Sequence, residues 1–179
     1  KAFNSVSKEY ISMDTFWANS VYGGVISSQL AVHCKVRDSD RLFVEGLLRD
    51  IGHLVMYQCI PKQTLQAKLF AAQEGTPLDQ NEREIIGFDY AQVGAELIRS
   101  WKLPGSMCES VEFHNNPGAA TGYPLEVAIA HVSARTVDAG RIANEAVAQE
   151  WKIEPLAMQV TGLNYESVQQ VANEAEQHA

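Results

Sequence analysis

The sequence predicts an all-α protein, a helical bundle, on three observations. Apolar residues recur every three or four positions along most of the 179 residues, as they do on the buried face of a helix. Prolines, glycines and capping residues divide these stretches from one another. No two segments show the alternating pattern of paired strands, and the chain contains no repeat or low-complexity tract.

Four helices are expected in the first half of the chain. Ser12 or Asp14 can cap the first helix, and Ser39 or Asp40 the second. The second helix is expected to run unbroken until Pro61, because proline lacks an amide hydrogen and disfavours helical geometry in the residue before it. The first helix is predicted to end near 33, and the next three to span 41–60, 62–73 and 81–86.

Five further helices are expected in the second half. Asp89 can cap the first of them, and Pro124 or Leu125 can open the third, which Gly140 can interrupt. His131 lies inside this apolar third helix, so we expect a buried histidine with satisfied ring nitrogens. The predicted ranges are 90–101, 106–114, 124 or 125 through 137, 155–160 and 164–175.

The composition excludes several classes of function. The formal net charge is −8, from 22 acidic and 14 basic residues with no basic run, which argues against nucleic acid or an anionic membrane surface as a direct partner. No apolar run approaches the roughly 20 residues that a transmembrane helix needs. The cysteines form no CxxC pair, so we expect no zinc ribbon and instead reduced thiols in a cytoplasmic protein: Cys34, Cys59 and Cys108.

The beginning of the chain favours a piece of a longer protein. Residues 1–5 lack the apolar core of a signal peptide, and residue 1 is not methionine. We expect a single domain over residues 1–179, with an N-terminal part of the parent protein missing.

The segment GLLRDIGHL at 46–54 carries the main chemical signal. Metal-dependent phosphohydrolases of the HD type use an adjacent His-Asp pair, because a cation must polarise a phosphoryl oxygen and activate water. Here that pair reads Arg49-Asp50. A guanidinium has only donors and stays protonated, so Arg49 cannot ligate a metal.

The wider pattern resembles the HDOD family, the HD-related output domains, whose fold is an HD-domain-like helical bundle. The segments that carry the resemblance fall in the family's order over about residues 10–140, with C-terminal helices expected over about 141–179. They are FWANS at 16–20, GLLRDIGHL at 46–54, GFDYAQVGA at 87–95, WKLP at 101–104 and EFHNNP at 112–117.

The resemblance also implies which residues occupy the metal-ligand positions of HD enzymes. Only two of the seven keep the ligand type, so the resemblance implies that the metal chemistry has been lost, with no catalytic residue, metal or cofactor expected. The seven vestigial positions are Asn19, Arg49, Asp50, Tyr90, His114, Asn115 and, approximately, Ala134.

The implied function is a non-catalytic, cytoplasmic signal-transduction domain that acts through a protein partner or a small ligand. Such a domain is often fused to an upstream receiver or sensory domain, as in a response regulator of a two-component system. The first alternative is a phosphohydrolase or cyclic-dinucleotide phosphodiesterase that uses Asp50 and His114. The second is a structural dimerisation domain, a homodimer built on an exposed apolar face of the last helix.

Two local features have open interpretations. Arg49 either replaces the lost cation inside the pocket, beside Asp50, or points to solvent, as the 100° spacing of adjacent helical residues favours. The triplet Gly122-Tyr123-Pro124 resembles the Gly-Tyr-Pro motif of HD-GYP enzymes. It is either a ligand-binding loop or a turn whose proline starts the next helix.

Overall fold

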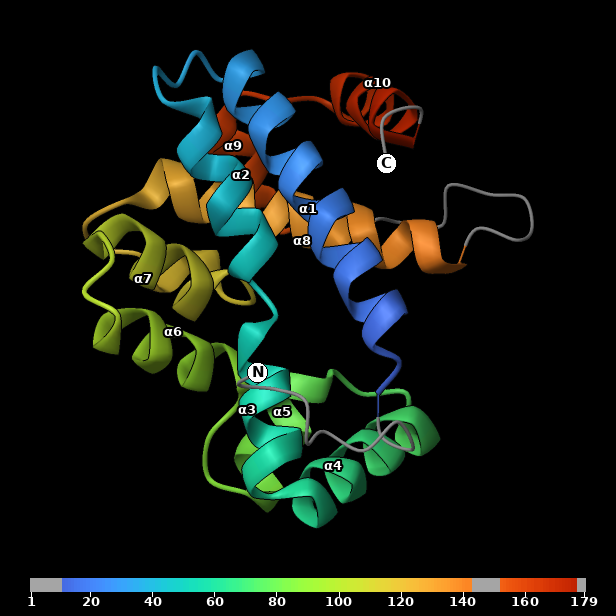
Figure 1. The fold of residues 1–179 in the computed structure, drawn as a ribbon. Coiled ribbons are helices and arrows are strands. Elements are labelled where there is room, and N and C mark those ends of the chain that lie inside the picture. The colour runs from blue at the N-terminus through green and yellow to red at the C-terminus, as the bar shows by residue number, and fades with distance from the viewer. Residues whose placement is uncertain (1–10, 143–151, 177–179) are drawn as a thin grey trace.

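The computed structural model describes residues 11–142 and 152–176, and every regular element within these ranges is a helix (Figure 1). This confirms the predicted all-α class. The expected beginning and end of the domain and the segment 143–151 lie outside the described residues. The elements are α1 (Met13–His33), α2 (Ser39–Leu48), α3 (Ile51–Cys59), α4 (Pro61–Glu74), α5 (Leu78–Ile85), α6 (Tyr90–Ser100), α7 (Gly105–Phe113), the 3-10 helix η1 (Pro117–Ala119), α8 (Pro124–Ile142), α9 (Pro155–Thr161) and α10 (Tyr165–Glu176).

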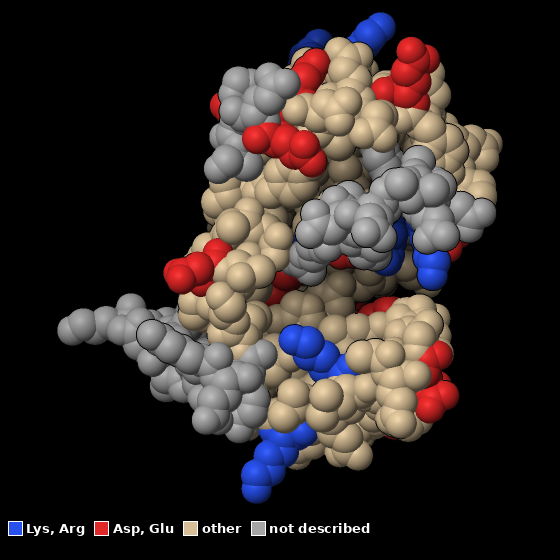
Figure 2. All heavy atoms as spheres, turned by 90° about the vertical axis from the view of Figure 1, so that its right-hand side faces the viewer, with Lys and Arg blue, Asp and Glu red and all other residues tan. Residues whose placement is uncertain are grey.

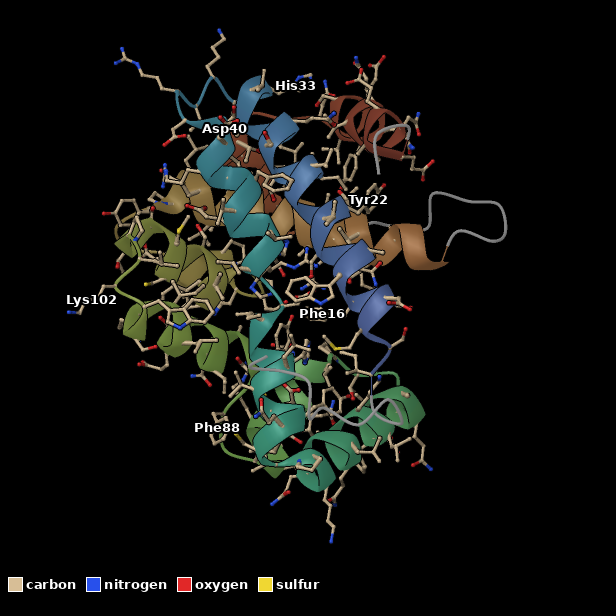
Figure 3. All side chains as sticks on the ribbon, viewed as in Figure 1. Phe16, Tyr22, His33, Asp40, Phe88 and Lys102 are labelled. Carbon is tan, nitrogen blue, oxygen red and sulfur yellow. The ribbon has the colours of Figure 1, made fainter. Side chains whose placement is uncertain are left out.

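The helices form two halves that meet near the middle of the molecule. α1, α2, α8, α9 and α10 lie in one half, α3, α4 and α5 in the other, and α6 and α7 along one side (Figure 1). The largest core cluster fills the first half. Phe16 of α1 lies where the halves meet (Figure 3) and packs against Ile51 and Leu54 of α3. Viewed from the side, acidic and basic side chains surround a hollow across the middle of the molecule (Figure 2).

The predicted helix over 41–60 is wrong in one respect: it is two helices. α2 ends at Leu48 and α3 begins at Ile51, and Asp50 between them has φ −98° and ψ 9°, outside the helical region. Periodicity does not reveal this break, because the apolar stripe continues on both sides of it. The cap of α2 also differs from the prediction, since the Asp38 carboxylate accepts the Arg41 amide hydrogen at 3.3 Å.

Other boundaries follow the expected local chemistry. The Ser12 side chain accepts the Thr15 amide hydrogen and caps α1, and Asp89 caps α6 in a reciprocal capping box with Gln92. Pro124 opens α8, as predicted, and Gly140 does not interrupt this helix, which continues to Ile142. None of the helices in the described residues is both long and apolar enough to cross a bilayer.

Two glycines of the GLLRDIGHL segment allow helices to approach closely. A Cβ atom on Gly52 would lie 1.9 Å from the Tyr90 carbonyl oxygen, where α3 crosses α6. A Cβ atom on Gly46 would lie 2.6 Å from the Gly23 carbonyl oxygen, where α2 crosses α1. Backbone cannot yield as a flexible side chain can, so both glycines are required by packing.

The apolar face of α10 is buried inside the chain, which answers a question that the sequence left open. Its apolar residues pack against α1 and α8 in the main core. Tyr22 of α1 (labelled in Figure 3) strengthens this contact, since its hydroxyl donates to the Ala172 carbonyl oxygen at 3.4 Å. The dimerisation alternative therefore loses the feature on which it depended: Val168, Val171, Ala172 and Ala175.

Candidate functional site

Arg49 and Asp50 form a buried, two-point ion pair at the break between α2 and α3. Arg49 Nε lies 3.0 Å from Asp50 Oδ1, and Nη2 lies 2.7 Å from Oδ2. The Arg49 side chain is 4% exposed and that of Asp50 15%. Arg49 therefore does not point to solvent, and the geometry matches the alternative in which its charge lies inside the protein beside Asp50.

The break in the helix explains how sequence neighbours can form this pair. In a continuous helix the two side chains would diverge by about 100°. Asp50 instead serves as the residue before α3, and its non-helical backbone turns its carboxylate back toward Arg49. Side-chain pairing and backbone break are thus parts of one local structure.

The two charges hold each other ionised. Burial alone would raise the pKa of Asp50, but the Arg49 guanidinium outweighs it, and the pKa of this carboxyl lies well below its usual range. Burial would likewise lower the pKa of Arg49, and Asp50 raises it above its ordinary value. The pair carries no net charge, so it is far cheaper to bury than either ion alone.

Tyr90, His114 and Asn115, from three of the ligand positions, form a hydrogen-bonded chain. The Tyr90 hydroxyl lies 3.0 Å from His114 Nε2, and Asn115 Nδ2 donates to that hydroxyl at 2.9 Å. His114 Nδ1 lies 2.7 Å from the Val111 carbonyl oxygen, which can only accept, so Nδ1 carries the hydrogen. Nε2 is then the acceptor of the Tyr90 hydroxyl hydrogen.

The protonation states of this chain follow from burial. Burial, aided by the nearby Arg49 charge, lowers the pKa of His114 to about 3, so the imidazole is neutral at pH 7. Burial also raises the pKa of Tyr90, and the Asp50 charge adds to this effect, which keeps the phenol protonated. Each ring therefore has the one protonation state that satisfies the chain.

Arg135 and Asp138 of α8 join the site, and the sequence did not single them out. Arg135 Nη2 donates to Asn115 Oδ1 at 2.8 Å, while Nη1 lies 3.3 Å from Asp138 Oδ2. Asp138 also acts electrostatically on Arg49. Their spacing of three on one helix is a signal for a pair, but only the fold places that pair beside Asn115.

The remaining two vestigial positions contribute differently. Ala134 is buried on α8 beside Arg135. Asn19 is half-buried on α1, one turn before Gly23, where a Cβ atom would lie 3.5 Å from Arg49 Nη1. The structure brings five of the seven predicted positions together through ion pairs, hydrogen bonds or electrostatic contacts, and the role of all seven stays a prediction.

A second buried carboxylate, that of Glu82, contacts the backbone of Tyr90. Glu82 accepts the Tyr90 amide hydrogen at 2.8 Å, and the His53 ring stacks on the Tyr90 ring with centroids 3.9 Å apart. Burial raises the pKa of Glu82 to about 7. His53 Nδ1 lies 3.9 Å from Glu82 Oε1, so this group ties α3, α5 and α6 together.

The Gly122-Tyr123-Pro124 turn is held by a carboxylate side chain of the same protein. The Glu109 carboxylate accepts the amide hydrogens of Thr121, Gly122 and Tyr123. These bonds lower the pKa of Glu109, although its partial burial acts in the opposite direction. Because these amide donors are engaged, the geometry favours a turn at the start of α8 over a ligand loop.

The residues at the HD-type positions do not fit a resident metal ion. Arg49 stands at a predicted ligand position, both Asp50 oxygens accept from it, and the unprotonated nitrogen of His114 accepts from Tyr90. In the two ranges that the structure covers, no three His, Cys, Asp or Glu side chains gather in an arrangement able to hold a metal ion. A metal centre needs three or more such ligands with open lone pairs.

A helical bundle with these positions at its centre defines an HD-like domain, and solved structures share this fold. A protein from Shewanella amazonensis SB2B, provisionally assigned as a phosphohydrolase, matches with a TM-score of 0.76 and 21% identity over 94% of this chain and 61% of its own. A provisionally assigned signal transduction protein from Marinobacter aquaeolei VT8 matches with a TM-score of 0.77 and 17% identity, over 99% of this chain and 39% of its own. The MmoQ response regulator from Methylococcus capsulatus strain Bath matches with a TM-score of 0.65 and 17% identity, over 92% of this chain and 62% of its own.

The sequence comparison gives the family. The family model of the HDOD domain matches residues 1–117, and the chain belongs to the HDOD family. An uncharacterized protein of Treponema pallidum (strain Nichols) is 28% identical over 100 residues, 54% of this chain. The chain spans only a fifth of that relative and less than two thirds of each solved chain above.

Proposed function

We propose that this chain is a non-catalytic regulatory domain of a signalling protein, whose HD-type pocket is closed by its own side chains. The observation that carries the proposal is the state of the two retained ligands. Asp50 is bound at both oxygens by Arg49, and His114 is bound at both ring nitrogens by Tyr90 and Val111.

Chemistry gives the reason. A metal ion needs lone pairs, and both Asp50 oxygens and the unprotonated nitrogen of His114 already accept a hydrogen bond. Binding a cation would also place it against the Arg49 guanidinium, and like charges in a buried site repel strongly. Catalysis of the HD type would thus require Arg49 and Tyr90 to leave the pocket together.

The regulatory role is supported by the kind of protein in which the fold occurs. Two structural neighbours are described as a signal transduction protein and a response regulator, and both are longer than this chain. We accordingly propose a protein partner in a signalling pathway, with an upstream receiver or sensory domain in the parent protein.

The test is metal content together with phosphoester hydrolysis. The protein is purified after loading with iron, manganese or zinc, and assayed on bis(p-nitrophenyl) phosphate and on a cyclic dinucleotide. We expect substoichiometric metal and no hydrolysis above that of Asp50→Ala. Stoichiometric metal that is lost in Asp50→Ala, with hydrolysis, would overturn the proposal in favour of a phosphohydrolase.

A gain-of-binding variant serves as the matched control. The triple change Arg49→His, Tyr90→His and Asn115→His restores imidazoles where the resemblance places ligands, and we expect it to bind more metal than the natural chain. If the triple variant folds and still binds none, the loss of metal binding does not depend on these replacements.

A further inference from the structure

Two hydrogen-bond chains meet at His114, one at its ring and one at its backbone. The first consists of residues at the vestigial positions and reaches Arg135. The second uses His131 and reaches the segment that precedes α9. His114 is fully buried, so both chains meet inside the core.

The first chain has a single direction. Arg135 donates to Asn115 at 2.8 Å, Asn115 to the Tyr90 hydroxyl at 2.9 Å, and Tyr90 to His114 Nε2 at 3.0 Å. His114 then donates to the Val111 carbonyl oxygen. Its outer end is accessible, because the Arg135 side chain is 25% exposed and Asn115 is half-buried.

The second chain crosses from α7 to the C-terminal helices. His131 Nδ1 lies 2.7 Å from the His114 carbonyl oxygen, which fixes the hydrogen on Nδ1. His131 Nε2 is therefore an acceptor, and the Glu154 amide donates to it at 2.9 Å. His131 is 1% exposed, and burial lowers its pKa, so the neutral ring persists.

Glu154 is the residue immediately before α9, so the bond from its amide to His131 ties the start of that helix to α8. On either side of it, Ile153 and Ala157 are buried in the main core with α1 and α8. A displacement of His114 would move the acceptor on which the Glu154 amide depends, because ring and carbonyl belong to one residue at the end of α7.

We infer that Tyr90, His114, His131 and Glu154 couple the vestigial pocket to the start of α9. The replacements that remove metal ligands supply this coupling, since tyrosine and asparagine can each donate and accept where histidine ligands would face an ion. The inference rests on the proposed function and adds the route by which the pocket acts. Loss of the Tyr90 hydroxyl would leave the buried His114 Nε2 without its donor, and a resulting shift of His114 would move the carbonyl oxygen to which His131 donates.

The experiment measures hydrogen exchange of the Glu154 amide by NMR in the whole chain. Tyr90→Phe removes the hydroxyl at the start of the route and keeps the ring that stacks on His53. Tyr123→Phe is the matched control, because Tyr123 is 42% exposed and lies outside both chains. We expect exchange at Glu154 to accelerate about tenfold in Tyr90→Phe and not in the control, while Ile26 and Leu30 of the α1 core keep their rates.

Two further variants keep the inference falsifiable. His131→Gln weakens the acceptor of the Glu154 amide directly, so it should give the largest increase in the exchange rate of that amide. Arg135→Met perturbs the accessible end of the first chain and should give a smaller increase. Unchanged exchange at Glu154 in Tyr90→Phe would overturn the coupling. Equal acceleration at Glu154, Ile26 and Leu30 would also overturn it, since it reports general destabilisation. The exchange measurement is made in EDTA, so its result does not depend on bound metal. Metal-dependent hydrolysis in the separate assay would overturn the proposed function, whereas the exchange rates alone test the coupling.

Discussion

Arg49 and Asp50 are adjacent in sequence and bind each other through two parallel contacts of 3.0 and 2.7 Å across the break between α2 and α3. A bidentate guanidinium–carboxylate pair is both strong and directional. Here it neutralises the buried Asp50 carboxylate with a cation that the chain itself supplies.

Removing Arg49 should strongly destabilise the fold. In Arg49→Met the Asp50 carboxylate stays buried without its partner, and we expect the free energy of unfolding to fall by about 3 to 5 kcal/mol. Arg37→Met is the control, because Arg37 is exposed before α2. Urea unfolding at pH 7 measures both. Equal small changes in the two variants would show that Arg49 is not an internal counter-ion.

Removing both charges should recover much of the loss. The double variant Arg49→Met, Asp50→Leu leaves no unpaired buried ion, so we expect it to be more stable than Arg49→Met alone. A double-mutant cycle that includes Asp50→Leu gives the coupling energy. A cycle with no coupling would contradict the pairing seen between these side chains.

Gly52→Ala should be far more harmful than an ordinary glycine substitution. Its Cβ atom would lie 1.9 Å from the Tyr90 carbonyl oxygen, and we expect a loss of about 3 kcal/mol or more as α3 is forced from α6. Gly140→Ala is the matched control, since a Cβ atom there meets nothing closer than 3.8 Å. Within α8 the control should stabilise by about 0.5 to 1 kcal/mol. Thermal unfolding that ranks the variants the other way would refute the close crossing.

Glu45 should make the protein less stable as the pH rises. Burial raises the pKa of Glu45 from 4.5 to about 7. Between these values the unfolded chain loses the proton and the folded chain keeps it, so folding becomes less favourable with rising pH. The change is complete above about pH 7 and amounts to about 3 kcal/mol.

The variant Glu45→Gln isolates this effect. It should flatten the fall in unfolding free energy between pH 4.5 and 8, relative to the natural chain, and leave the slope caused by other acids such as Glu82. Glu74→Gln, at the exposed end of α4, is the control for the loss of one carboxylate. Parallel pH profiles for natural chain and Glu45→Gln would mean that Glu45 titrates normally in the folded state.

Glu109 should be needed to order the turn before α8. Its carboxylate accepts three successive amide hydrogens, so Glu109→Ala should accelerate hydrogen exchange at Thr121, Gly122 and Tyr123. Glu112→Ala is the control on the same helix, because Glu112 pairs with Arg99 instead. Protection that survives in Glu109→Ala would show that the turn is ordered by other contacts.

The sequence by itself determined the helical class, most helix positions and the family. These depend on local chemistry: periodic apolar faces, the capping box at Asp89 and the proline at the start of α8. It also determined that Arg49 cannot be a metal ligand, because the chemistry of a guanidinium does not depend on its surroundings.

The tertiary structure alone decided how the residues at the predicted ligand positions pair with one another. The break at Asp50 depends on a buried partner, and helical periodicity continues through it, so the sequence favoured an outward Arg49. The link from Asn115 to Arg135, and from His114 through His131 to Glu154, joins residues whose proximity depends on how α6, α7 and α8 pack. Sequence spacing carries no such distances, because each helix can pack at several angles and registers until the whole core is formed.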